Sequence, residues 1–183
     1  NMWKALQIKS PTLQINSLGS HVERMSYRKA LIDYFSKYSE KLDEDCKRRI
    51  ETNPLRILDS KNPDLQEIIL DSPKLIKHLE KDSLQQFDAV QRILTDNKIP
   101  YEVNPHLVRG LDYYNNLVFE WVVDKQRAQG SICAGGRYDT LIEQLGGKPS
   151  PAAGFAIGLE RLLDVVSDKL IIPAPVSYTH LPL

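Results

Sequence analysis

The sequence predicts an α+β protein, in which an antiparallel sheet with flanking helices carries an inserted helical subdomain. Eight of the nine glycines lie between Gly110 and Gly158, so turns and close backbone approaches gather in that part of the chain. Residues 21–98 instead contain a succession of capped, apolar-periodic segments that are typical of short helices. Short β-rich runs lie on both sides of them. Helices segregated from an antiparallel sheet in this way indicate the α+β class.

The chain opens with a short strand and a capped helix. Residues 13–16 alternate apolar and polar side chains and end at a turn over residues 17–19. Ser20 is followed three residues later by Glu23, which is the capping-box pattern of a helix start. Apolar side chains then continue at helical spacing and predict a core-facing stripe: Leu31, Tyr34, Phe35, Tyr38 and Leu42.

Prolines mark the boundaries of the helices that follow. Asn53 stands before a proline that breaks the first helical pattern. Asn62 and Ser72 also precede prolines, and each pair predicts a capped helix start. Asp82 opens a last helix, which ends near Asn97.

From residue 101 onwards the pattern changes from helices to strands. Residues 101–103 form a short strand, and the β-rich run 117–123 is predicted to pair antiparallel with 131–134 across a loop. Small residues at 154–158 predict a further strand. An apolar helical pattern follows it directly, from Leu159 to Val166.

The composition is that of an ordinary globular protein, with 42% hydrophobic and 26% charged residues, and it excludes several classes of function. Lys plus Arg and Asp plus Glu both number 24, so the net charge is zero, which argues against indiscriminate nucleic-acid binding. The two cysteines, Cys46 and Cys133, exclude a disulfide scaffold and fit a reducing compartment such as the cytoplasm. Four scattered histidines predict no metal site. No run approaches 18 apolar residues and the first twenty residues lack a signal-peptide core, so neither membrane insertion nor export is predicted.

One segment, Leu-Val-Arg-Gly-Leu-Asp-Tyr-Tyr-Asn-Asn at 107–116, combines side chains suited to a small anionic ligand. The guanidinium of Arg109 offers a rigid fork of donors that matches a carboxylate or a phosphate. The glycine beside it lets a ligand come close. Tyr113 and Tyr114 each offer a flat apolar face with one hydrogen-bonding tip. The alternative is a strand-edge turn whose polar side chains lie on the surface.

Two glycine-containing segments are the other candidates. In Cys-Ala-Gly-Gly-Arg-Tyr-Asp at 133–139, the backbone of the paired glycines can approach a small ligand, and Tyr138 would be held over the same pocket. Neither a P-loop lysine nor a dinucleotide fingerprint follows, which excludes a phosphate loop. In 154–162, small side chains leave room for a flat group such as a purine, and Arg161 can stack on it or meet its phosphates. A packed strand–helix corner with a salt-bridging arginine is the alternative.

Together these segments resemble the histidyl-tRNA synthetases, a family of class II aminoacyl-tRNA synthetases. The similarity covers roughly residues 1–170. LVRGLDYYNN (107–116) resembles the first histidine-specific motif of the family, and AGGRYD (134–139) resembles the second. GFAIGLERL (154–162) resembles class II motif 3. Two further segments also match the family pattern: LQINSLGS (13–20) and KLDEDCKRRIETNPLRILDSKNP (41–63). The fold that it implies is part of the class II antiparallel sheet with its flanking helices.

The resemblance implies a ligase reaction in two steps. Histidine and ATP, normally with Mg²⁺, first form histidyl-adenylate and pyrophosphate. The histidyl group then passes to the terminal adenosine of tRNA(His). Such chemistry proceeds by positioning and electrostatic stabilisation, and it needs no covalent protein nucleophile.

The resemblance also implies roles for individual residues. Arg109 matches the arginine that reaches the histidine carboxylate and the α-phosphate, and Arg161 matches the motif 3 arginine at the ATP; these are the candidate catalytic residues. The histidine-binding candidates are Arg109, Tyr113, Tyr114 and Tyr138. The remaining positions are those where backbone is expected to come close to substrate: Gly158 at the ATP, and Gly135 and Gly136 in the histidine pocket.

The chain also departs from the family pattern. It begins after motifs 1 and 2 and lacks the anticodon-binding domain, so we expect a fragment that forms no histidyl-adenylate alone, whereas the full-length enzyme is expected to be a homodimer. Leu117 stands where the family more often has threonine. We expect four parts: a strand and turn of the catalytic core (1–20), a helical insertion (21–98), the core with the motifs (99–170) and a non-native tail (171–183).

Two alternative functions remain open at this point. The first is the synthetase-like regulatory subunit of ATP phosphoribosyltransferase, which binds partners but charges no tRNA. The intact LVRGLDYY segment and the helical insertion favour the synthetase. The second is a non-catalytic RNA-contacting module, in which the helical insertion touches the acceptor stem of the tRNA.

Overall fold

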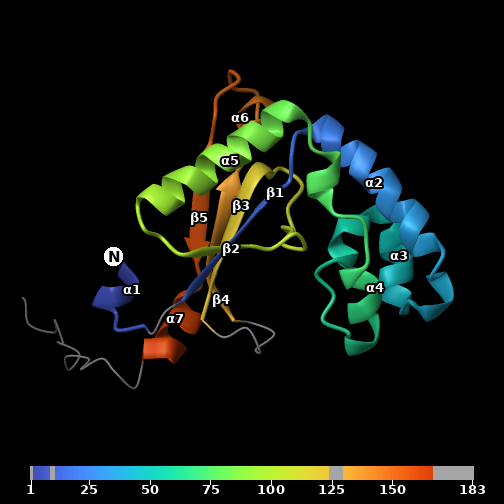
Figure 1. Ribbon diagram of the computed structural model, residues 1–183, viewed down its shortest axis with the longest axis horizontal. Coiled ribbons are helices and arrows are strands. Elements are labelled where there is room, and N and C mark those ends of the chain that lie inside the picture. The colour runs from blue at the N-terminus through green and yellow to red at the C-terminus, as the bar shows by residue number, and fades with distance from the viewer. Residues whose placement is uncertain (1, 9–10, 124–129, 167–183) are drawn as a thin grey trace, which may run out of the picture.

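The computed structural model describes residues 2–8, 11–123 and 130–166, and a five-stranded sheet lies at its centre (Figure 1). In sheet order the strands are β2 (Tyr101–Val103), β1 (Thr12–Ser17), β3 (Asn115–Val122), β4 (Ser131–Arg137) and β5 (Ala153–Ile157). Each strand predicted from the sequence is therefore confirmed. The tail expected at 171–183 lies outside the described residues.

One strand pair is parallel, and this corrects the expectation of a wholly antiparallel sheet. β2 runs parallel to β1, with Leu13 opposite Tyr101 and Ile15 opposite Val103. The pairs β1–β3, β3–β4 and β4–β5 are antiparallel. Parallel neighbours need a long crossover connection, and residues 21–98 provide it because they return the chain to the end where β1 began. The sheet is therefore mixed, and the α+β class is confirmed.

Helices and 3₁₀ turns are the other regular elements of the described structure. No strand occurs within residues 21–98. The α-helices are α1 (Met2–Ala5), α2 (His21–Ser36), α3 (Glu44–Thr52), α4 (Gln66–Leu70), α5 (Lys81–Asp96), α6 (Leu141–Gln144) and α7 (Leu159–Val166); the 3₁₀ turns are Ser39–Lys41, Pro54–Ile57, Pro63–Leu65 and Leu75–His78.

Two of the four predicted helix starts are capped as expected. The last of the four helices, α5, begins at Lys81 without a side-chain cap, so Asp82 lies in its first turn and does not open it. Ser20 and Glu23 form the expected capping box of α2. The side chain of Asn62 caps the next turn by accepting from the Asp64 amide. Ser72 does not cap a helix, because its hydroxyl donates to the Ile69 carbonyl at 2.6 Å at the end of α4.

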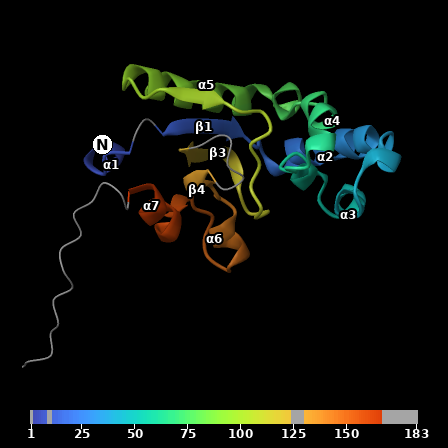
Figure 2. The same ribbon diagram turned by 90° about the horizontal axis from the view of Figure 1, so that it is seen from below.

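Two groups of helices take up different positions around the sheet. α2, α3 and α4 lie together beside one end of it, whereas α5 runs along it in both views (Figures 1 and 2). Phe87 of α5 is buried with Leu13 and Ile15 of β1. The division of the chain into a helical insertion at 21–98 and a catalytic core stays a prediction. α5 lies within residues 21–98, and it packs on the sheet.

The largest apolar cluster joins the helices to the segment that carries the first motif. Tyr27, Leu31 and Phe35 of α2 are fully buried, and Tyr114 and Val118 belong to the same cluster. Burial of apolar surface there fixes α2 against the start of β3. In the described part of the chain, no helix combines the length and the apolar character needed to cross a bilayer.

Candidate active site

The segment that connects β2 to β3 is tied to the rest of the fold at both ends. The buried Asn16 amide, on β1, donates to the carbonyl of Leu107 at 3.0 Å. Arg24, on α2, donates to the carbonyls of Asp112 at 3.2 Å and Tyr114 at 2.6 Å. These bonds satisfy backbone groups that no strand partner reaches. These hydrogen bonds therefore hold the motif residues in place relative to β1 and α2.

Three tyrosines from the segments 107–116 and 134–139 meet in one cluster. The ring centroids of Tyr113 and Tyr114 are 4.7 Å apart, and Tyr138, at the end of β4, lies 5.7 Å from Tyr113 and 6.0 Å from Tyr114. Burial and the hydrogen bond with Tyr113 raise the pKa of Tyr114. Its phenol is thus neutral near pH 7 and can donate as well as accept a hydrogen bond.

The paired glycines of β4 make room for packing. A Cβ atom at Gly136 would lie 2.6 Å from the Leu117 carbonyl oxygen and 2.9 Å from a ring carbon of Tyr114. A Cβ atom at Gly135 would lie 2.2 Å from the carbonyl oxygen of Gly154 on β5. Any side chain at these positions would push apart the strands or the tyrosines. A ligand contact with either backbone stays a prediction.

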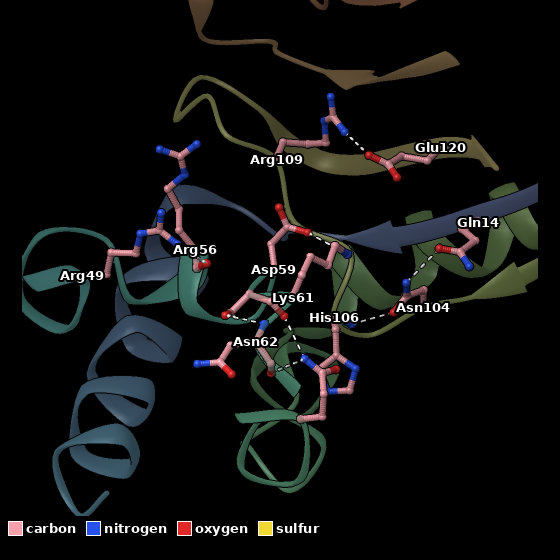
Figure 3. A network of polar contacts seen from close by, with 12 residues as sticks. Gln14, Arg49, Arg56, Asp59, Lys61, Asn62, Asn104, His106, Arg109 and Glu120 are labelled. Atoms are coloured by element: carbon pink, nitrogen blue, oxygen red, sulfur yellow. Dashed lines mark hydrogen bonds and ion pairs between the residues drawn. The ribbon is translucent and has the colours of Figure 1, made fainter. Parts of the chain in front are cut away.

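Arg109 lies between the tyrosine cluster and β3. Its Nη1 makes an ion pair with Oε1 of Glu120, and the two side chains point toward each other (Figure 3). The guanidinium carbon is 5.8 Å from the ring centroid of Tyr114, within the range of a cation–π contact. The structure therefore brings Arg109 together with the predicted tyrosines and adds a carboxylate to them.

Arg161 occupies a separate cleft from the tyrosines. The first turn of α7 follows Gly158 and carries Arg161, whose Nη1 donates to the Ser131 carbonyl at 3.1 Å. A Cβ atom at Gly158 would meet only the Arg161 side chain, at 3.5 Å, an ordinary contact. The cleft has a volume of about 440 Å³, and its polar lining includes Gln14, Asp59, Lys61, His106, Glu120 and Arg161.

Glu120 connects the two parts of the site, and the sequence interpretation did not include it. It lines the cleft of Arg161 while it pairs with Arg109. The sequence feature that could have identified Glu120 is that it is the one carboxylate in the β-rich run 117–123. Burial of a charge without a partner is costly, so a glutamate at such a position implies a cation nearby. No comparable sequence feature indicated that Asn16 and Arg24 hold the segment before β3.

The model of the family described as histidyl-tRNA synthetase matches residues 27–162. The chain belongs to this family. The match contains the tyrosine cluster, both arginines and Glu120.

The similar relatives are ligases of the same family, and they are considerably longer. A histidine–tRNA ligase of Dechloromonas aromatica (strain RCB) is 56% identical over 180 residues, which are 97% of this chain and 42% of that protein. The corresponding ligase of Nitrosomonas eutropha is 57% identical over 167 residues, 91% of this chain and 40% of that protein. The chain thus spans about two fifths of the length of these relatives.

Solved structures show the same fold. The crystal structure of apo S. aureus histidyl-tRNA synthetase superposes with a TM-score of 0.66 and 33% identity, over 92% of this chain and 41% of that one. A structure from Bacillus halodurans C, titled as an ATP phosphoribosyltransferase regulatory subunit/histidyl-tRNA synthetase, has a TM-score of 0.54 and 19% identity, over 90% of this chain and 47% of that one. At that identity, the second similarity shows the fold alone.

Proposed function

We propose that the protein carrying this chain is a histidine–tRNA ligase that activates histidine with ATP and transfers it to tRNA(His). The observation that carries the proposal is the guanidinium of Arg109 beside Tyr113, Tyr114 and Tyr138, in a chain 56% identical to ligases of that name. Family membership alone would not separate a ligase from a regulatory relative. A cation next to a cluster of tyrosine rings suits an amino acid with an aromatic ring and a carboxylate.

In the first step, the histidine carboxylate attacks the α-phosphate of ATP, and pyrophosphate leaves with its electron pair. We assign to Arg109 the stabilisation of the negative charge that grows on the phosphate. The tyrosine cluster would hold the imidazole by ring packing and hydroxyl hydrogen bonds. Arg161 would contact the ATP from its own cleft, near Gly158. Mg²⁺ would accompany the triphosphate, whose oxygens are the hard ligands that it prefers.

In the second step, a hydroxyl of the terminal adenosine of the tRNA attacks the histidyl carbonyl carbon, and AMP leaves. The acceptor stem of tRNA(His) is therefore a proposed partner, and a second copy of the full-length protein is another. We place the enzyme in the cytoplasm, where its tRNA substrate is found. The 183-residue chain alone is expected to form no adenylate, because it spans only about two fifths of its relatives' length.

The test compares Arg109→Ala, Arg109→Lys and Arg92→Ala in the full-length protein, since Arg92 is an exposed arginine of α5 that serves as a matched control. Loss of one such electrostatic contact costs roughly 10²–10³ in rate. We therefore expect Arg109→Ala to slow histidine-dependent ATP–pyrophosphate exchange by that factor. Transfer from preformed adenylate should suffer less, and lysine should rescue only in part because an ammonium lacks the planar fork.

Pre-steady-state kinetics separate the two steps. Normal histidine activation by Arg109→Ala would refute the role assigned to that residue. Equal loss of both steps with a lowered melting temperature would indicate a structural role instead. If the wild-type protein itself shows no histidine-dependent exchange, the ligase proposal is wrong.

A further inference from the structure

Glu120 stands at the middle of β3, on the face of the sheet where the site lies. It is opposite Gln14 of β1 on one side and Ala134 of β4 on the other, and Ala134 is in turn opposite Ala156 of β5. Directly opposed residues of neighbouring strands share one face of a sheet. The two alanines are small, so this face has room for the long side chains of Glu120 and its partner.

The ion pair that Glu120 makes is largely shielded from water. The side chains of Arg109 and Glu120 are 23% and 20% exposed. Burial raises the pKa of Glu120, and the positive charge of Arg109 opposes that rise. Asp59 and Lys61, on the loop of the helical segment that faces the pair, act on the same carboxylate with opposite signs. In this environment the pair holds its geometry more firmly than an exposed pair does.

Within the described residues, Glu120 engages only one nitrogen of the Arg109 guanidinium. That nitrogen is Nη1, and Nε is buried without a hydrogen-bond partner among the same residues. A buried donor without a partner is a rare feature that needs an explanation. Glu120 therefore orients the fork through one terminal nitrogen, and the other terminal nitrogen, Nη2, is the donor left to meet an anionic ligand, whereas Nε is enclosed. This differs from a structural ion pair, in which both charged groups satisfy each other.

We propose that Glu120 is a positioning residue of the histidine activation step, which acts by holding the Arg109 guanidinium in the orientation that receives the substrate's charged groups. The inference rests on the proposed ligase function and adds a residue to it. A free arginine side chain samples many rotamers, and ordering it in advance removes that cost from the reaction. The glutamate makes no contact with the substrate in this role.

The kinetic test uses the full-length protein with Glu120→Ala, Glu120→Gln and, as a control, Glu67→Ala on the exposed face of α4. A misplaced catalytic group commonly costs about 10²-fold in rate. We expect Glu120→Ala to lower kcat of ATP–pyrophosphate exchange about 10- to 100-fold, with KM for histidine and ATP changed less than about threefold. Glu120→Gln retains an acceptor oxygen and should recover most of the loss.

A double-mutant cycle shows whether Glu120 acts through Arg109. In the Arg109→Ala background, Glu120→Ala should change kcat by less than about twofold, because no guanidinium is left to orient. An independent loss of 10- to 100-fold in that background would overturn the inference. So would an unchanged kcat of Glu120→Ala, or a fall in melting temperature that glutamine does not restore.

A spectroscopic measurement on the 183-residue chain separates this inference from the ligase proposal. The Nε–H group of Arg109 should give a slowly exchanging NMR signal, identified by its absence in Arg109→Lys. Glu120→Ala should abolish the signal, and Glu67→Ala should not. A signal that persists in Glu120→Ala would overturn the positioning role even in an active ligase. If the chain gives the signal but the full-length wild-type protein shows no histidine-dependent exchange, the ligase function is overturned instead, and with it the catalytic purpose of the contact.

Discussion

The buried carboxylate of Glu23 joins the starts of two helices, and its removal should destabilise the protein strongly. It is 3% exposed. It accepts from the Ser20 amide at 2.6 Å at the start of α2, and also from the Glu80 amide and, at 2.7 Å, the Ser83 hydroxyl at the start of α5. A carboxylate near helix N-termini is also favoured by the helix dipole. Through it, α2 is connected to the helix that packs on the sheet.

The size of the effect follows from those contacts. A buried donor left without an acceptor costs about 1–3 kcal/mol, so Glu23→Ala, which abandons two backbone amides, should cost about 2–6 kcal/mol. Glu23→Gln keeps one oxygen but loses the charge and turns an amide NH₂ toward a donor. We expect it to lower the free energy of unfolding by about 2 kcal/mol, which at an m-value of about 2 kcal/mol/M moves the urea midpoint by about 1 M.

The pH dependence of the loss has a defined sign. Hydrogen bonds from Ser20, Glu80 and Ser83 outweigh burial and lower the pKa of Glu23 in the folded state. The stability due to its charge is therefore complete above the unfolded-state pKa of about 4.3, and it is lost as the pH falls through the lower folded-state pKa. The difference between wild type and Glu23→Gln should thus be full at neutral pH and disappear in acid.

The assay is urea unfolding of the 183-residue chain, followed by circular dichroism at several pH values. Glu67→Gln is the matched control, because it makes the same chemical change at an exposed position of α4. It should leave the free energy of unfolding within about 0.5 kcal/mol of wild type. Equal midpoints for Glu23→Gln and this control at neutral pH would refute the reasoning.

Two further outcomes are expected from the packing of the sheet. Gly136→Ala should lower stability by about 1–3 kcal/mol, because its methyl group would overlap the Leu117 carbonyl, whereas Gly158→Ala should have little packing cost; thermal melts of both variants check this. Phe87→Ala should lower the free energy of unfolding by about 3–5 kcal/mol, because Phe87 is buried with Leu13 of β1. It should also expose the amides of β1 to hydrogen exchange. Unchanged protection of β1 would mean that α5 is not part of the sheet's core.

Local chemistry explains why much of the secondary structure could be predicted. The capping box of Ser20 and Glu23 needs residues only three apart, and the alternation of residues 13–16 is visible within β1 itself. The expected helix start at Ser72 was wrong, and the reason is also local. The Ser72 hydroxyl donates to the carbonyl of Ile69, three residues earlier, and this bond competes with capping of a following helix.

The candidate site was predictable only as a set of segments. Arg109 and the three tyrosines were identified through family resemblance, because side chains brought together from the segment before β3 and the residue after β4 follow no spacing rule of their own. Nothing in the periodicity placed Tyr138 within 6.0 Å of Tyr114. That distance depends on the register of the two strands and on the absence of a Cβ atom at Gly136.

By itself, the sequence determined the α+β class, the positions of the strands, the first helix cap and the family of this protein, because those depend on neighbours along the chain or on contiguous motifs. Only the tertiary structure decided the parallel pairing of β2 with β1 and the partner of Arg109. Parallel pairing depends on where the long crossover of residues 18–100 returns the chain. The pairing of Arg109 with Glu120 depends on the loop before β3 folding back over that strand, where a largely shielded carboxylate requires a cation and the segment held by Asn16 and Arg24 supplies one.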